Sequence, residues 1–120
     1  MKTILLVDDH GDSRYVYSTV LRHSGYRVVE AKDGGEGVQL AQQHKPDVVV
    51  MDLQLPFMDG YQATEVLKAD PETAHIPVVA VSVHSRDVDQ ARAQAVGCDS
   101  FLAKPCEPTR LVQEIRRVLA

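Results

Sequence analysis

The sequence has no long apolar segment. None of its hydrophobic runs approaches the roughly 20 residues that a membrane-spanning helix needs. The first ten residues, MKTILLVDDH, contain one lysine and a short apolar run that ends in two acids. They lack the longer apolar region and the small-residue cleavage site of a signal peptide. We therefore expect neither a membrane span nor a secretion signal, and we interpret the first apolar run as a strand.

Positive charge and phosphate-binding loops are also scarce. The chain has 13 Lys and Arg against 17 Asp and Glu, a net charge of -4, so a nucleic-acid backbone is not an expected partner. A flavin- or nucleotide-binding protein would need a loop rich in Gly, Ser and Thr after its first strand. Residues Asp8 to Asp12 are acidic instead, which argues against that class.

Cysteine is limited to Cys98 and Cys106, whose spacing fits neither a zinc site nor a disulfide framework. We expect two reduced thiols and a cytoplasmic protein. The 120 residues suffice for one core and show no linker. The chain ends directly after its last expected helix, so we expect a single domain over residues 1–120 without an effector domain.

Five short apolar runs alternate with five segments of helical spacing. The run Val48–Met51 is apolar throughout and stops at Asp52, which is typical of a strand buried on both faces. The other expected strands are Thr3–Val7, Tyr26–Ala31, Ile76–Val83 and Ser100–Ala103, and the expected helices are Asp12–Ser24, Glu36–His44, Tyr61–Ala69, Asp87–Val96 and one that begins at Pro108.

This alternation predicts a parallel sheet with right-handed crossovers and helices on both faces. For one domain of this size we expect an α/β, flavodoxin-like (βα)5 fold, a doubly wound parallel five-stranded sheet with strand order 2-1-3-4-5. The carboxyl ends of the first and third strands are then neighbours, and ligands in such folds bind at that point.

The last two helices differ in how firmly their apolar faces can anchor them. The helix over Asp87–Val96 offers mostly Ala91 and Ala95 as inward residues, so we expect it to be loosely held. The last helix has the clearest amphipathic pattern in the chain, formed by Leu111, Ile115, Val118 and Leu119.

Polar side chains stand at the carboxyl ends of the expected strands. Asp8 and Asp9 follow the first strand and Asp52 ends the third, so three carboxylates should converge and repel one another. A hard divalent cation such as Mg²⁺ relieves this repulsion, prefers oxygen ligands and leaves room for a phosphoryl group. Ser82 near the end of the fourth strand offers a hydroxyl, and Lys104 after the fifth offers an ammonium.

This set of groups is what phosphoryl transfer to a carboxylate needs. Asp52 would be the nucleophile and form an acyl phosphate, while Mg²⁺ and Lys104 would neutralise the phosphoryl oxygens. Each group alone has a plainer role, since acids before a helix most often cap it, Ser82 could close a turn and Lys104 could be a solvated charge. Their shared position at one edge of the sheet favours the joint interpretation.

The same residues resemble the receiver domain of two-component response regulators over essentially the whole chain. The matching features occur in the expected order and at the expected strand ends. They are the acidic pair Asp8-Asp9, Arg14, the segment DLQLPFMDG over Asp52–Gly60, Ser82, Phe101 and the pair Lys104-Pro105.

The resemblance implies that Asp52 receives a phosphoryl group from a histidine kinase or a histidine phosphotransfer protein. It also implies that Asp9, Asp52 and the backbone carbonyl of Gln54 bind Mg²⁺ directly, with Asp8 holding the ion directly or through water. The protein would then be a signalling domain, not an enzyme, that catalyses only its own phosphorylation and slow dephosphorylation.

The resemblance further implies a switch that reaches a partner surface. Ser82 would hydrogen-bond a phosphoryl oxygen, Phe101 would move from exposed to buried, and the Lys104–Pro105 bond would be cis. A downstream protein would bind to the fourth helix, the fifth strand and the last helix, and the domain would be a monomer or a weak dimer. This output surface would include residues such as Phe101, Arg110 and Gln113.

Three positions near the site are expected to tune its rates. Gln54 and His84 stand two residues after Asp52 and Ser82, and in the receiver family these positions influence how fast the phosphoryl group is lost. We therefore expect them to set the signal lifetime. Val83 stands where the family usually has Ala or another small residue, and its branched side chain is expected to crowd the mouth of the site and slow small phosphodonors.

Two other functions would use the same residues. An aspartyl-phosphate phosphatase of the haloacid dehalogenase type usually has a cap domain and a second acid two residues after its nucleophile, where Gln54 stands here. A receiver-like interaction module that is never phosphorylated remains a further alternative. The intact acidic pair, Asp52 and Lys104 argue against it.

Overall fold

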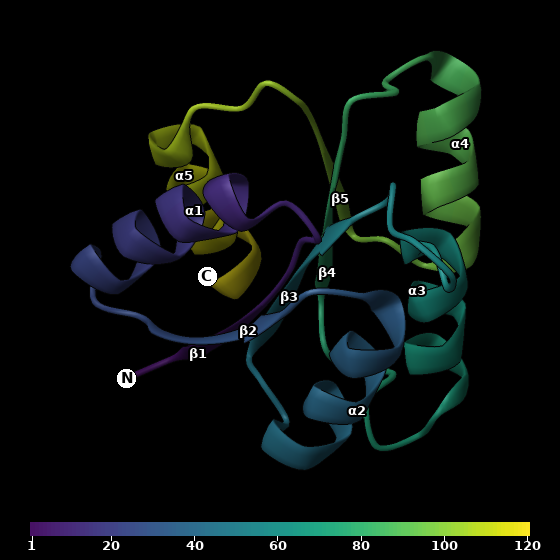
Figure 1. Ribbon diagram of the computed structural model, residues 1–120. Coiled ribbons are helices and arrows are strands. Elements are labelled where there is room, and N and C mark those ends of the chain that lie inside the picture. Colours follow the sequence, from purple (N-terminus) through teal and green to yellow (C-terminus); the bar gives the residue numbers. More distant parts are fainter.

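The computed structural model describes residues 1–120 and contains one five-stranded parallel sheet (Figure 1). Its strand order is β2-β1-β3-β4-β5, which confirms the topology expected from the sequence. β1 and β3 are central neighbours, so the switch point of the doubly wound fold lies between them. The strands are β1 (Thr3–Val7), β2 (Arg27–Ala31), β3 (Val48–Asp52), β4 (Val78–Ser82) and β5 (Ser100–Ala103).

Five helices cover the two faces of the sheet. In Figure 1, α1 and α5 lie on one side of the strands and α2, α3 and α4 on the other. None of these helices combines the length and apolar composition that crossing a membrane would require. The helices are α1 (Gly11–His23), α2 (Gly34–His44), α3 (Gly60–Ala69), α4 (Asp87–Val96) and α5 (Pro108–Leu119).

The side chains of the central strands alternate between two apolar cores, because successive residues of a strand point to opposite faces. Ile4 and Leu6 of β1 pack in the cluster that contains α1 and α5 residues. Leu5 and Val7 pack in the cluster that contains residues of α2, α3 and α4. The strand is therefore apolar from Ile4 to Val7, which is the pattern that identified it in the sequence.

β4 is shorter than expected at both ends. It begins at Val78 and not at Ile76, because Pro77 has no N–H with which to continue the ladder. Ile76 is still buried, but its N–H bonds to the Thr73 carbonyl of the preceding loop. At the other end the strand stops at Ser82, and Val83 is 58% exposed.

The prediction of which residues anchor α4 is wrong. Ala91 and Ala95 are exposed, and Ala93 is the one buried residue of the helix. The Arg92 guanidinium adds a contact with α3, 3.9 Å above the centre of the Tyr61 ring. The apolar face of α4 is as thin as expected, but it is centred on a different alanine.

The connection from β3 to α3 holds the backbone around Asp52 tightly. Asp59 caps α3 by accepting the Gln62 N–H, and the Gln62 side chain accepts the Asp59 N–H in return. A Cβ atom on Gly60 would stand 2.3 Å from the Asp52 carbonyl oxygen. Only glycine allows the start of α3 to lie this close to the end of β3.

Candidate functional site

The carboxyl ends of β1 and β3 bring two buried carboxylates together. Val7 pairs with Met51 across the two strands, so Asp8 and Asp52, each one residue further along, lie next to each other. Asp8 is only 2% exposed and Asp52 only 4%. Lys104 Nζ lies 3.4 Å from Asp8 Oδ2 and 3.1 Å from Asp52 Oδ2. The structure thus joins the ends of β1, β3 and β5, as the topology predicted.

Two buried carboxylates share one ammonium, and the pKa values reflect this arrangement. Burial raises the pKa of Asp52 above its ordinary value, against the opposing effects of the Gln54 N–H and of Lys104. For Lys104, burial acts to lower the pKa, but Asp52 and Asp8 outweigh it and hold the pKa above its ordinary value. Lys104 therefore stays an ammonium, and the carboxylates keep an excess of negative charge.

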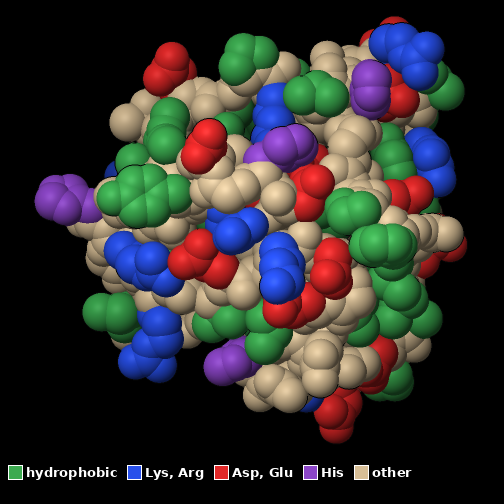
Figure 2. Space-filling view, viewed as in Figure 1, with side chains coloured by type: hydrophobic (Ala, Val, Ile, Leu, Met, Phe, Trp, Pro, Cys, Tyr) green, Lys and Arg blue, Asp and Glu red, His purple; other side chains and the backbone are tan.

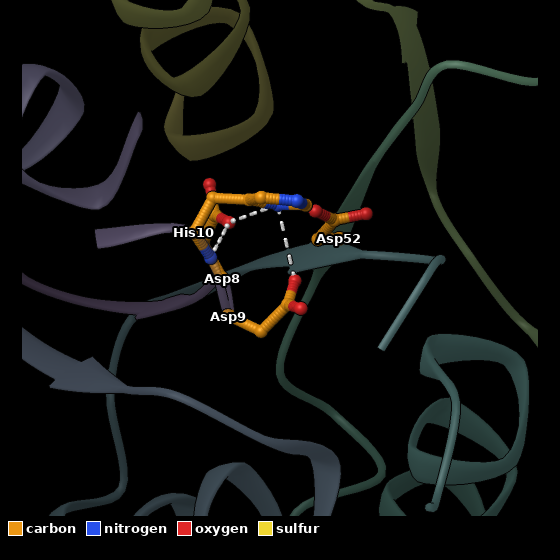
Figure 3. A group of neighbouring side chains, drawn as sticks. All are labelled: Asp8, Asp9, His10 and Asp52. Carbon is orange, nitrogen blue, oxygen red and sulfur yellow. Dashed lines mark hydrogen bonds and ion pairs between the residues drawn. The ribbon is translucent and has the colours of Figure 1, made fainter. Parts of the chain in front are cut away.

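Asp9 and His10 complete the acidic cluster, which Figure 3 shows at the end of β1. Ligand atoms of Asp8, Asp9, His10 and Asp52 all lie within 4.8 Å of one another. Asp9 Oδ1 is buried without a hydrogen-bond partner, and His10 Nδ1 lies 3.2 Å from it as an ion-pair contact. His10 is exposed at the rim.

This donor set fits a hard cation. Three carboxylates with one nearby ammonium leave uncompensated negative charge, and a buried carboxylate oxygen without a donor is costly unless something binds it. Oxygen ligands are what Mg²⁺ prefers, typically one or two carboxylates with several waters. The oxygen ligands and the negative charge of the cluster therefore fit the Mg²⁺ site expected from the sequence.

Ser82 lies on the other side of Asp52, on β4. It is completely buried; its hydroxyl donates to Gln54 Oε1 over 2.7 Å and accepts the His84 N–H at 3.1 Å. The Gln54 N–H in turn donates to Asp52 Oδ1 over 2.9 Å. The side chains of Gln54 and Ser82 are thus linked to each other, while those of His84 and Val83 are exposed to solvent.

Two further features support the loops around the cluster. Arg14 Nη1 donates to the Asp8 carbonyl over 2.8 Å, and its Nε lies 3.3 Å from Glu30. Arg14 thereby ties the β1–α1 loop to β2. The Lys104–Pro105 peptide bond is cis, as the family resemblance implied.

Phe101 stands on β5, away from the acidic cluster. Its side chain is half-buried against the core shared with α2, α3 and α4. It lines a cleft of about 400 Å³ between α4 and β5, together with residues such as Gln90 and Gln94.

In the view of Figure 2, acidic and basic side chains are interspersed over the surface and are not gathered into one basic patch.

A buried carboxylate on α5 was not predicted from the sequence. Glu114 is 6% exposed and accepts hydrogen bonds from Arg117 Nε at 3.1 Å, from Arg110 at 3.2 Å and from the Ser100 hydroxyl. Arg117, then Ser100 and Arg110, outweigh burial and lower the pKa of Glu114 to about 2. The available signal was the spacing of the arginines, four residues before and three residues after Glu114.

Comparisons with curated proteins agree with this geometry. The family model described as the response regulator receiver domain matches residues 4–116. The chain is 40% identical over 120 residues to Protein PilH of Pseudomonas aeruginosa, covering 99% of that protein. It is 33% identical over 118 residues to the polar-differentiation response regulator DivK of Brucella anthropi, covering 98% of this chain and 96% of that one.

Solved structures give the same result. The chemotaxis protein CheY4 of Vibrio cholerae superposes with a TM-score of 0.95 at 29% identity, with 99% of each chain covered. The receiver domain of the sensor histidine kinase PA1611 from Pseudomonas aeruginosa, described with a magnesium ion coordinated in its active site cleft, gives 0.91 at 31% identity, with 98% of this chain and 97% of that one covered. The chain belongs to the response regulator receiver domain family.

Proposed function

We propose that this receiver domain takes a phosphoryl group from a phosphohistidine onto Asp52. The observation that carries the proposal is the position of Asp52, buried beside Asp8 with one carboxylate oxygen 3.1 Å from the Lys104 ammonium. The donor would be a histidine kinase or a histidine phosphotransfer protein, the partner class implied by the family. The two free cysteines suit a cytoplasmic protein.

In the proposed step an Asp52 carboxylate oxygen attacks phosphorus and forms an O–P bond. The N–P bond of the phosphohistidine breaks, and its electron pair stays on the imidazole, which takes a proton from water. Lys104 keeps its proton throughout and neutralises phosphoryl oxygens in place of the carboxylate it now faces. The Gln54 N–H holds the other carboxylate oxygen and so fixes the direction of attack.

Asp8, Asp9, Asp52 and the Gln54 carbonyl would hold Mg²⁺. The ion, when bound, supplies positive charge against the phosphoryl oxygens. Asp9 contributes the oxygen that lacks a donor within the protein. His10 lies exposed beside it.

Phosphorylation would switch a binding surface for a downstream protein on α4, β5 and α5. The exposed positions Arg110 and Gln113 and the cleft beside Phe101 support this assignment. A helix with only Ala93 buried requires little free energy to shift. A monomer or weak dimer would suffice for such a switch.

Gln54, Val83 and His84 would tune the rates of this chemistry. Val83 is exposed next to the buried Ser82, so its branched side chain stands at the approach to the site. We expect Val83→Ala to speed phosphorylation by acetyl phosphate; an unchanged or slower rate would count against a steric role for Val83. Replacing Gln54 and His84 together by alanine should change the dephosphorylation rate.

Intact-mass analysis after incubation with acetyl phosphate and Mg²⁺ tests the acceptor. The wild type should gain one phosphoryl group and Asp52→Ala should gain none. Asp12→Ala, a change of the same type at an exposed acid on α1, should still be modified. A wild type that stays unmodified would instead indicate an interaction module, and a modified Asp52→Ala would place the acceptor elsewhere.

A further inference from the structure

One hydrogen bond at the site occupies a donor that a phosphoryl group on Asp52 would need. The Ser82 hydroxyl donates to Gln54 Oε1 over 2.7 Å. It already accepts the backbone N–H of His84 at 3.1 Å. A hydroxyl has one proton, so Ser82 has no donor left for another oxygen while it is bonded to Gln54.

Gln54 is positioned to make this contact by its own backbone. Its N–H is fixed by Asp52 Oδ1 at 2.9 Å, and Ser82 is fixed by the Lys104 N–H, which donates to the Ser82 carbonyl over 2.8 Å. Ser82 is completely buried and Gln54 is half-buried. A buried hydroxyl needs an acceptor, and without a phosphoryl group the Gln54 side chain supplies it.

We propose that Gln54 is a resting-state latch for Ser82. Its side-chain oxygen holds the Ser82 hydroxyl in the unphosphorylated protein and must release it before that hydroxyl can donate to a phosphoryl oxygen on Asp52. Gln54 is thus a positioning residue that acts through Ser82. The inference rests on the proposed phosphoacceptor function, and it differs from control of the signal lifetime, which concerns access of water to the acyl phosphate.

The latch makes a thermodynamic prediction. Breaking it removes a hydrogen bond from the resting state and none from the phosphorylated state, so a ligand that needs Ser82 should bind more tightly. One neutral hydrogen bond corresponds to a change of about twofold to tenfold in affinity. The gain should vanish where position 82 has no hydroxyl.

Beryllofluoride with Mg²⁺, which mimics a carboxylate-bound phosphoryl group, is the probe. Its dissociation constant is measured by calorimetry for the wild type, Gln54→Leu, Ser82→Ala and the double variant, after their amide spectra confirm folding. Gln54→Leu should tighten binding by about twofold to tenfold and should have no effect in the Ser82→Ala background. Gln39→Leu, the same change at an exposed position of α2, should leave the affinity unchanged.

Gln54→Glu tests whether the side-chain oxygen at position 54 acts as an acceptor for Ser82, because it removes the amide NH₂ and keeps an oxygen acceptor. A carboxylate can only accept, and its hydrogen bond with the Ser82 hydroxyl is charge-assisted and stronger, so it tightens the latch, while its charge weakens anion binding with or without Ser82. Gln54→Glu should therefore weaken binding more in the presence of the Ser82 hydroxyl than in its absence.

The outcomes are separable. Equal effects of Gln54→Leu with and without the Ser82 hydroxyl, or no gain in either background, would overturn the latch while leaving the acceptor function intact. If no folded variant, the wild type included, bound beryllofluoride, the proposed phosphoacceptor function would fall, and the latch would fall with it.

Discussion

Replacing Glu114 by glutamine should expose how much of the stability depends on one buried carboxylate. Glu114 accepts hydrogen bonds from Arg117, Arg110 and the Ser100 hydroxyl, and so joins α5 to β5. Glutamine keeps the size of the side chain and removes its charge. The two arginines then lose a charge-assisted acceptor, and a side-chain NH₂ points at donors instead of accepting from them.

The magnitude follows from the pKa of Glu114. Its fall from 4.5 to about 2 corresponds to ~3 kcal/mol of the free energy of unfolding, at about 1.4 kcal/mol per pKa unit. Because the folded pKa is depressed, this stability is fully present above the unfolded value of 4.5 and is lost as the pH falls toward about 2. Above that window, Glu114→Gln should be less stable than the wild type by ~2–3 kcal/mol, since solvent reaches the arginines and weakens the pairs.

Urea unfolding of both proteins between pH 7 and about pH 3 measures this difference. The wild type should lose its advantage over Glu114→Gln as the pH falls, because protonated Glu114 resembles glutamine. Glu65→Gln, at an exposed acid of α3 without a hydrogen bond, should remain within ~0.5 kcal/mol of the wild type. A difference between wild type and Glu114→Gln that stayed constant over this pH range would refute the assignment of the stability to the charge of Glu114.

Two further changes test other contacts. Gly60→Ala should lower the free energy of unfolding by ~1–3 kcal/mol and slow phosphorylation by acetyl phosphate, because its Cβ would lie 2.3 Å from the Asp52 carbonyl oxygen. The control Gly11→Ala, whose Cβ meets no atom within 4 Å, should do neither. Equal effects of the two substitutions would contradict the steric argument. Arg92→Leu removes the contact with Tyr61, so it should lower the free energy of unfolding by ~0.5–1 kcal/mol and speed hydrogen exchange in α4 relative to α5. Unchanged exchange in α4 would show that this contact does not hold the helix.

The parallel sheet could be predicted because it follows from strong, local signals, whereas the strand order was taken from the fold expected of one α/β domain of this size. The meeting of Asp8 with Asp52 follows from that order. Apolar runs such as Val48–Met51 are too short for helices and have no polar face, so they fix the parallel sheet. Once the order is 2-1-3-4-5, the register of β1 with β3 leaves little freedom for the residues that follow them. Lys104 is placed by the same logic, one residue beyond β5.

The anchoring of α4 could not be predicted for a physical reason. Ala91, Ala93 and Ala95 have the same side chain, so their pattern contains no information about which one faces the sheet. Tertiary packing decides, including the stacking of Arg92 on Tyr61. The link between Gln54 and Ser82 was equally hidden, since it depends on rotamers of residues 28 positions apart in the chain.

The site combines a part that is held by the neighbouring strands β1 and β3 with a part at the end of β4 that is free to move. Asp8 directly follows β1 and Asp52 ends β3, and the side chains of these two neighbouring strands are buried on both faces. Ser82 ends β4, where the chain continues through exposed residues into the thinly anchored α4. A phosphoryl group on Asp52 would bring a charge of about −2 to carboxylates that Lys104 already fails to neutralise. The Ser82 hydroxyl can respond to this charge by exchanging its hydrogen bond with Gln54 for one with a phosphoryl oxygen. Movement should therefore begin at β4 and reach α4 before it disturbs β1 or β3.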